Sequence, residues 1–114
     1  MRALVPTQRP PRATLLKGRL QDWSRTLLFN LLANLGDGQI TFRDRNGART
    51  LGQRPQLQAE ITVHDPAFYP RVLFGGSIGA GEAYVDGLWE TGSLATLARI
   101  MVRNMDLLDR MEQG

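Results

Sequence analysis

Cysteine is absent from this 114-residue sequence, and histidine occurs once, at His64. Without cysteine the chain can form no disulfide, thiol nucleophile or thiolate metal site. A single histidine without such partners makes a poor metal site, and a catalytic role would require a nucleophile or acid within reach. We therefore expect His64 to be structural or to face solvent, with no metal ion and no catalytic residue in this chain.

Long apolar runs are also missing. No stretch approaches the ~20 apolar residues that a membrane span needs, and the basic N-terminus has no continuous apolar core like that of a signal peptide. The lack of cysteine fits a reducing compartment. Together these absences predict a cytoplasmic protein.

Charge is unevenly divided along a chain whose composition is otherwise that of one globular domain. Residues 1–54 carry ten Lys/Arg against three Asp/Glu, whereas residues 55–114 carry four against eight. The basic half could bind an anionic surface, or both halves could present ordinary solvated faces. Few aromatic residues lie among the basic ones, and those few fall on predicted apolar faces, so we expect no nucleic-acid partner.

The N-terminal third is expected to hold an arm and a helix. Residues 1–13 contain three prolines and three arginines, which predicts a flexible basic arm before a single domain over residues 14–114. Apolar residues then recur at steps of three and four, which predicts an amphipathic helix that Thr14 caps and Gly36 ends. The apolar positions are Leu16, Leu20, Trp23, Leu27, Leu28, Leu31, Leu32 and Leu35.

The basic residues of this helix, Lys17, Arg19 and Arg25, lie off its apolar stripe. They could hold the helix on an anionic membrane. Alternatively, and more commonly, the apolar face of such a helix packs on a sheet. Both arrangements are open from the sequence.

Strand patterns follow the helix. Ile40 and Phe42 alternate with polar residues, and Asn46-Gly47 predicts a two-residue hairpin turn with positive φ at both positions. Residues 57–63, LQAEITV, alternate strictly and predict a half-buried antiparallel strand. The expected fold is therefore α+β, with a small antiparallel sheet flanked by helices.

The next segment reads as a short helix. Asp65 is expected to cap it, Pro66 to open it, Pro70 to distort it and the double glycine at 75–76 to end it. Beyond it, residues 82–90 are expected to be extended, because interior glycines cost a helix ~1 kcal/mol each.

The C-terminal part predicts a helix that opens at Ser93. Its stripe is rich in methionine, which is typical of an adaptable contact surface, so a homodimer or a bound partner helix is an open alternative. The stripe consists of Leu94, Leu97, Met101, Met105, Leu108 and Met111.

The stretch GGSIGAGEAYVDGLWE holds five of the twelve glycines. It is not a nucleotide loop, because Tyr84 stands where G-x-G-x-x-G needs its third glycine and no Gly-Lys-Ser/Thr follows. Glu82, Asp86 and Glu90 repeat every four residues and would share one face of a helix, which would suggest a carboxylate metal site. On extended structure they instead bind turn amides or pair with arginines.

The order of residues in VHDPAFYPRVLFGGSIGAGEAYVDGLWE resembles the N-terminal region of cyclopropane-fatty-acyl-phospholipid synthases, which are S-adenosylmethionine-dependent methyltransferases of membrane lipids. The dense resemblance covers about residues 61–104, a weaker one reaches back to Gly36, and Pro70 departs from the pattern. Its positions are Asp65, Pro66, Phe68, Tyr69, Arg71, Val72, Leu73, Gly79, Gly81, Glu82, Tyr84, Asp86, Gly87, Trp89 and Glu90.

The resemblance implies a non-catalytic accessory domain that packs on a methyltransferase domain. The family's S-adenosylmethionine loop would lie beyond Gly114, so we expect no cofactor and no activity in this chain alone. The domain would engage phospholipid acyl chains or an anionic membrane surface at the inner face of the membrane. A weaker likeness to sterol-carrier-protein folds, which hold lipids in an apolar tunnel, makes a free-standing lipid carrier the alternative.

The implied contacts with lipid or with the catalytic domain are Phe68, Tyr69, Arg71, Phe74, Glu82, Tyr84, Asp86 and Trp89. Phe68, Tyr69 and Phe74 are candidates for exposed aromatics, and Arg71 is a candidate to bind a lipid phosphate. The alternative is that these residues fill the core, and it is the favoured one for Phe68 and Trp89. Glu82 and Asp86 would stabilise turns or the interdomain contact.

Overall fold

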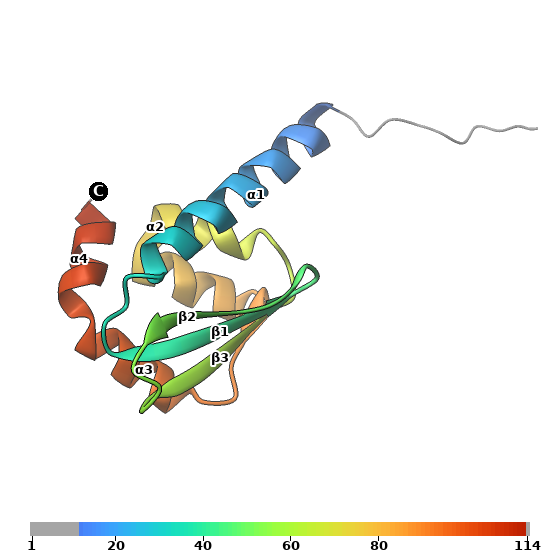
Figure 1. The fold of residues 1–114 in the computed structure, drawn as a ribbon. Coiled ribbons are helices and arrows are strands. Elements are labelled where there is room, and N and C mark those ends of the chain that lie inside the picture. The colour runs from blue at the N-terminus through green and yellow to red at the C-terminus, as the bar shows by residue number, and fades with distance from the viewer. Residues whose placement is uncertain (1–11, 114) are drawn as a thin grey trace, which may run out of the picture.

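A computed structural model of the protein describes residues 12–113 (Figure 1). Its helices gather over one face of a four-stranded sheet, which confirms the predicted α+β class. The elements are α1 (Arg12–Leu32), β1 (Gly38–Asp44), β2 (Gly47–Gln53), β3 (Gln58–Val63), α2 (Phe68–Val85), β4 (Trp89–Glu90), α3 (Leu94–Arg103) and α4 (Met105–Gln113).

The sheet is mixed rather than antiparallel as predicted. Its order is β2-β1-β3-β4, and β1 pairs with β2 antiparallel but with β3 in parallel. The chain reverses after β2, where Arg54 has a φ of 60°, and β3 then pairs with the opposite edge of β1. A strand that reverses relative to β2 must run parallel to β1, a pairing that the alternation of side chains could not reveal.

The predicted hairpin exists, but its turn lies one residue earlier than expected. Asp44 pairs with Gly47, so Arg45 and Asn46 form the loop. Of the two predicted turn residues, Asn46 and Gly47, only Gly47 has a positive φ, of 120°. The Asp44 carboxylate accepts a hydrogen bond from the backbone N–H of Asn46 at 2.9 Å, and this local bond shapes the turn.

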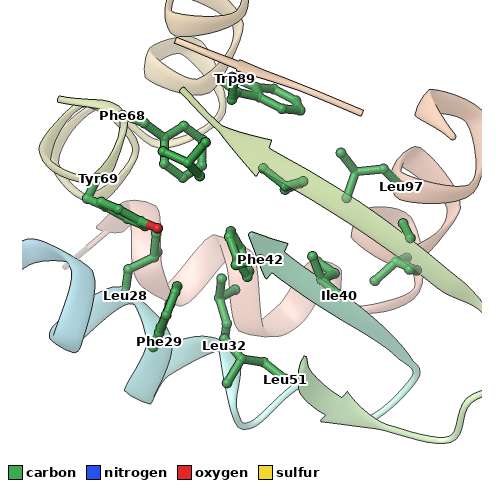
Figure 2. Close-up of a cluster of buried hydrophobic side chains, with 14 of the residues drawn as sticks. Leu28, Phe29, Leu32, Ile40, Phe42, Leu51, Phe68, Tyr69, Trp89 and Leu97 are labelled. Carbon is green, nitrogen blue, oxygen red and sulfur yellow. The ribbon is translucent and has the colours of Figure 1, made fainter. Parts of the chain in front are cut away.

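One apolar core joins the sheet to three helices, and aromatic rings form its centre (Figure 2). Phe29 of α1 packs against Phe42 of β1 with ring centroids 5.0 Å apart, and against Tyr69 of α2 at 5.7 Å. Phe68 packs against Trp89 of β4 at 5.9 Å. The predicted alternation in β3 is confirmed, since its buried side chains are those of Ala59, Ile61 and Val63.

Helix α1 uses the predicted apolar stripe in two ways. Leu28 and Leu32 are buried in the core, whereas Leu16, Leu20 and Trp23 are exposed. The N-terminal half of the helix extends away from the sheet and the other helices (Figure 1). Packing on the sheet is therefore confirmed for the C-terminal half of the helix, and contact of the exposed half with a membrane stays a prediction.

The boundaries of α1 differ from the prediction. The helix begins at Arg12 and ends at Leu32, so Thr14 lies within it rather than capping it, and Gly36 follows a turn. The arm predicted for residues 1–13 lies, except for its last two positions, outside the described residues.

Helix α2 is longer than predicted. It breaks at Gly76, with φ 60° and ψ −142°, where the short helix was expected to end. It then resumes to Val85, which corrects the extended structure predicted from position 82. Gly79 is required there, since a Cβ atom would collide with the carbonyl oxygen of Arg71. Pro70 causes no break because it lies in the first turn, where a missing N–H costs little.

Ser93 is the N-cap of α3, as predicted, but the last helix is interrupted at Asn104. This side chain is buried and uses all its hydrogen-bonding capacity. Its Oδ1 accepts from the backbone N–H of Gly36 at 3.0 Å and of Asp37 at 3.2 Å. Its Nδ2 donates to the carbonyl oxygens of Asp37 and Ile100, both at 2.7 Å. Asn104 thus ties the α3–α4 junction to the segment between α1 and β1.

We expect Asn104→Ala to lower the free energy of unfolding by about 2–3 kcal/mol, because it leaves buried backbone groups without partners. Urea denaturation followed by far-UV circular dichroism measures this change. Asn30→Ala, at an exposed position of α1, is the matched control and should change stability by no more than about 0.5 kcal/mol. Equal stability of the two variants would contradict the role given to Asn104.

Candidate functional site: an apolar cavity and an exposed apolar surface

Three of the predicted contact residues lie in the core. Phe68 and Trp89 are buried, as the favoured alternative had it, whereas Tyr69, only 1% exposed, is not the surface aromatic that was predicted. The indole N–H of Trp89 donates to the carbonyl oxygen of Ala80 at 2.9 Å, fixing β4 against α2. Packing in the core accounts for the positions of these three rings, so no lipid contact is needed to explain them.

Tyr69 belongs to a hydrogen-bonded cluster with Asp44 and Arg25. The Tyr69 hydroxyl donates to Oδ2 of Asp44 at 2.5 Å, and Nε of Arg25 donates to the same oxygen at 2.7 Å. The Arg25 guanidinium also lies 4.5 Å from the ring centroid of Phe29. Arg25 is therefore directed at the protein, which corrects its prediction as a membrane-facing residue. The cluster fixes the middle of α1 to β1 and α2.

The cluster sets the charges of its members. Burial opposes ionisation of Asp44, but the hydrogen bonds from Tyr69 and Arg25 prevail and lower the pKa of its carboxyl. Burial, followed by the hydrogen bond to Asp44, raises the pKa of the Tyr69 phenol well above its usual value. At neutral pH the carboxylate is therefore charged and the phenol keeps its proton to donate.

The remaining predicted contacts lie on α2 and are at least partly exposed. Nη1 of Arg71 pairs with Oδ2 of Asp86 at 2.5 Å, which links the two halves of the broken helix. Tyr84 is half-exposed and its ring packs on Trp89 at 5.1 Å. Glu82 is exposed on the helix rather than placed at a turn. Arg71 thus already has an anionic partner within the chain.

Phe74 is 67% exposed, as expected, and it lies on Trp23 with ring centroids 6.1 Å apart. Trp23 continues the exposed face of α1 formed by Leu16 and Leu20 at helical spacing. Exposed Lys17 and Arg19 stand on either side of this face. We call these six residues the α1–α2 surface; they are Leu16, Lys17, Arg19, Leu20, Trp23 and Phe74.

A cavity of about 530 Å³ lies between the helices and the sheet. Ile40, Phe42 and Ile61 of the sheet form its floor, and side chains from all four helices form its walls. The remaining lining residues are Leu28, Leu31, Leu32, Phe68, Val72, Leu73, Gly76, Ser77, Ala80, Gly81, Trp89, Leu94, Leu97, Ala98, Met101, Val102, Met105, Leu108 and Asp109. Asp109 is the single charged residue of this set.

The mouth of the cavity lies beside α3 and α4. Leu94, Val102 and Met105 line the cavity and are each more than half exposed. Leu94 and Met105 belong to the apolar stripe predicted as a contact surface; the side chain of its last member, Met111, lies outside the described residues. The stripe therefore lies at the opening of a cavity and does not form a flat contact surface.

Carboxylates and histidine do not assemble into a metal site among residues 12–113. His64 is half-exposed, and its Nε2 lies 3.5 Å from Oε1 of Glu90. None of the helices in the described range combines the length and apolar character of a membrane span.

Two curated proteins are similar to part of this chain. They are the cyclopropane-fatty-acyl-phospholipid synthases of Escherichia coli strain K12 and of Escherichia coli O6:H1 strain CFT073, and each is 46% identical over 50 residues. The alignment covers 44% of this chain and 12% of either relative, so it supports a partial relationship. No protein-family model and no solved structure matches the chain. The likeness to sterol-carrier-protein folds therefore stays a prediction.

Reasoning from the residue pattern missed the cavity and the role of Asp44, and only the likeness to sterol-carrier-protein folds had suggested an internal apolar space. Small residues at helical spacing in α2, Gly76, Ala80 and Gly81, were a signal for the cavity, because they leave room where larger side chains would fill the core. Asp44 carried no such signal, since an aspartate before a turn is ordinary.

We expect Asp44 to make the fold acid-sensitive. Because its folded-state pKa is lowered below the unfolded value of about 3.9, its contribution is complete above that pH and is lost as the pH falls through the folded pKa. Asp44→Asn should therefore reduce stability by about 1–3 kcal/mol at pH 7 and should flatten the decline below pH ~4. Urea titrations at several pH values measure both, with exposed Asp22→Asn as control. An unchanged acid decline in Asp44→Asn would contradict the assignment.

Proposed function

We propose that this chain is a non-catalytic, lipid-engaging domain of a cyclopropane-fatty-acyl-phospholipid synthase-like protein. It docks on anionic membranes through the α1–α2 surface. The observation that carries the proposal is the exposed apolar face of Leu16, Leu20, Trp23 and Phe74.

A contiguous exposed apolar surface with basic neighbours marks an interaction site more often than ordinary solvated surface. Trp23 is 52% exposed although it stacks on Phe74, so both rings present area to a partner. Tryptophan favours the interface between water and lipid, and apolar helix faces bury themselves in the headgroup region.

Charge selects an anionic partner. Lys17 and Arg19 flank the apolar face, and each basic residue near an anionic leaflet contributes about 1 kcal/mol. Residues 1–54 as a whole carry ten basic against three acidic residues. The similar synthases are named for a fatty-acyl-phospholipid. Because phospholipids form membranes, this name supports a membrane surface as the partner of this chain. A methyltransferase domain would pack elsewhere, and exposed Glu82 remains a candidate for that contact.

The charge-reversed variant Lys17→Glu/Arg19→Glu should bind phosphatidylglycerol vesicles at least about tenfold more weakly than the native chain, because attraction becomes repulsion at the docking face. Co-sedimentation with vesicles measures the affinity, and added salt should weaken native binding. Arg45→Glu/Arg99→Glu changes the net charge equally at exposed positions outside this surface. Equal loss in both variants would contradict docking through α1, as would failure of the native chain to bind.

Tryptophan fluorescence should report the same event. Trp89 is 7% exposed and Trp23 is 52% exposed, so transfer into lipid changes mainly the environment of Trp23. We expect the emission of the native chain to shift to shorter wavelength with phosphatidylglycerol vesicles, and the shift to be absent in Trp23→Phe. A shift that persists in Trp23→Phe would place the contact elsewhere.

A further inference from the structure

We propose that the cavity between the helices and the sheet binds one unbranched acyl chain of a phospholipid. This goes beyond membrane docking, because the α1–α2 surface could bind a bilayer without any internal space. The two sites use different residues and can be tested separately.

The size of the cavity indicates a binding site. Protein interiors pack at crystal-like density and contain few voids larger than a water molecule. About 530 Å³ far exceeds such a void and falls within the range of about 300–1,000 Å³ that is usual for small-molecule sites. The space extends from exposed Met105 down to buried Ile40 and Phe42, so a chain entering at the mouth could reach the sheet.

The lining selects an uncharged, flexible, apolar group. The lining residues include no lysine or arginine, and their single charged residue, Asp109, would repel a phosphate or carboxylate. The polar end of a ligand is therefore expected to stay outside while its apolar chain enters. Met101 and Met105 can adjust their side chains to such a chain. Gly81 and Ala80 keep one wall of α2 free of bulky groups.

The exposed face of α1 connects the two sites, which favours a membrane phospholipid as the source of the chain. Trp23, Leu27 and Leu31 recur at steps of four and therefore share one face of the helix. Trp23 belongs to the α1–α2 surface, and Leu31 lines the cavity. An apolar path thus leads along one helix from the docking surface to the cavity.

Trp89 lines the cavity and provides the test. In Trp23→Phe, Trp89 is the sole tryptophan of the chain. We expect lysophosphatidylcholine with one dibrominated acyl chain, kept below its micelle concentration, to quench its fluorescence saturably. Native mass spectrometry should show one lipid per chain. Because this probe is zwitterionic and not part of a vesicle, the result does not depend on membrane docking.

A second substitution in the same background should block the cavity without disturbing the fold. A Cβ atom at Gly81 meets open space, and leucine favours a helix over glycine, so Gly81→Leu should fold at least as well. It should weaken quenching at least about tenfold by occupying the cavity. Gly75→Leu is the matched control, because Gly75 is equally unobstructed but does not line the cavity. Thermal denaturation confirms that both are folded.

Absent quenching, or quenching that Gly81→Leu leaves unchanged, would overturn the acyl-chain site even if vesicle binding is intact. Quenching by a dibrominated free fatty acid but not by the lysophospholipid would overturn the phospholipid as the source. Lipid-free dimers whose formation Gly81→Leu abolishes would instead assign the cavity to a second copy of the chain. Saturable, Gly81-dependent quenching by the lysophospholipid supports the site even if vesicle binding fails.

Discussion

The hydrogen bonds of one buried amide join two segments that are far apart in the sequence and lie beside the cavity. Asn104 joins the α3–α4 junction to Gly36 and Asp37 across 67 or more positions of sequence. These bonds hold the break between α3 and α4 against the loop that precedes β1. Because Met105 and Leu108 line the cavity, α4 provides one of its walls. A leucine at this position would add apolar area but would leave the backbone groups of the loop unpaired.

Glycine sets the opposite wall. The break at Gly76 divides α2 into a first half that inserts Phe68 and Tyr69 into the core and a second half with small residues, and both halves line the cavity. Gly79 lets the two halves pack so closely that a Cβ atom would strike the backbone. The pair between Arg71 and Asp86 then bridges them. Glycine weakens a helix, but here the close packing of the two halves of α2 requires residues without a side chain.

The spacing of apolar residues predicted most helices and strands, because each element buries one face and its apolar residues therefore recur with the period of that element. It predicted the wrong sheet type, since parallel pairing of β1 and β3 depends on where the chain crosses after Arg54. It also predicted extended structure from position 82, where α2 instead continues to Val85, because the cost of nearby glycines was judged without the packing that overrides it. The exposure of Tyr69 was predicted wrongly, because its ring packs in the core and its hydroxyl donates to Asp44. The sequence left the surroundings of Leu16 open, and this side chain is exposed because α1 extends beyond the sheet.

Because α1 extends beyond the sheet, the proposed docking surface and the cavity wall both include side chains of this one helix. The cluster of Arg25, Asp44 and Tyr69 fixes the middle of the helix, so its N-terminal half is held outward in a defined direction. The face of Leu28 and Phe29 is committed to the core, and the neighbouring face of Trp23 and Leu31 is not. An exposed apolar stripe lowers solubility unless something covers it. The stripe runs from Leu16 beside basic Lys17, past Trp23, to Leu31 in the wall of the apolar cavity. The proposed lipid ligand would cover both ends of this stripe, because the docking surface and the cavity both present apolar side chains.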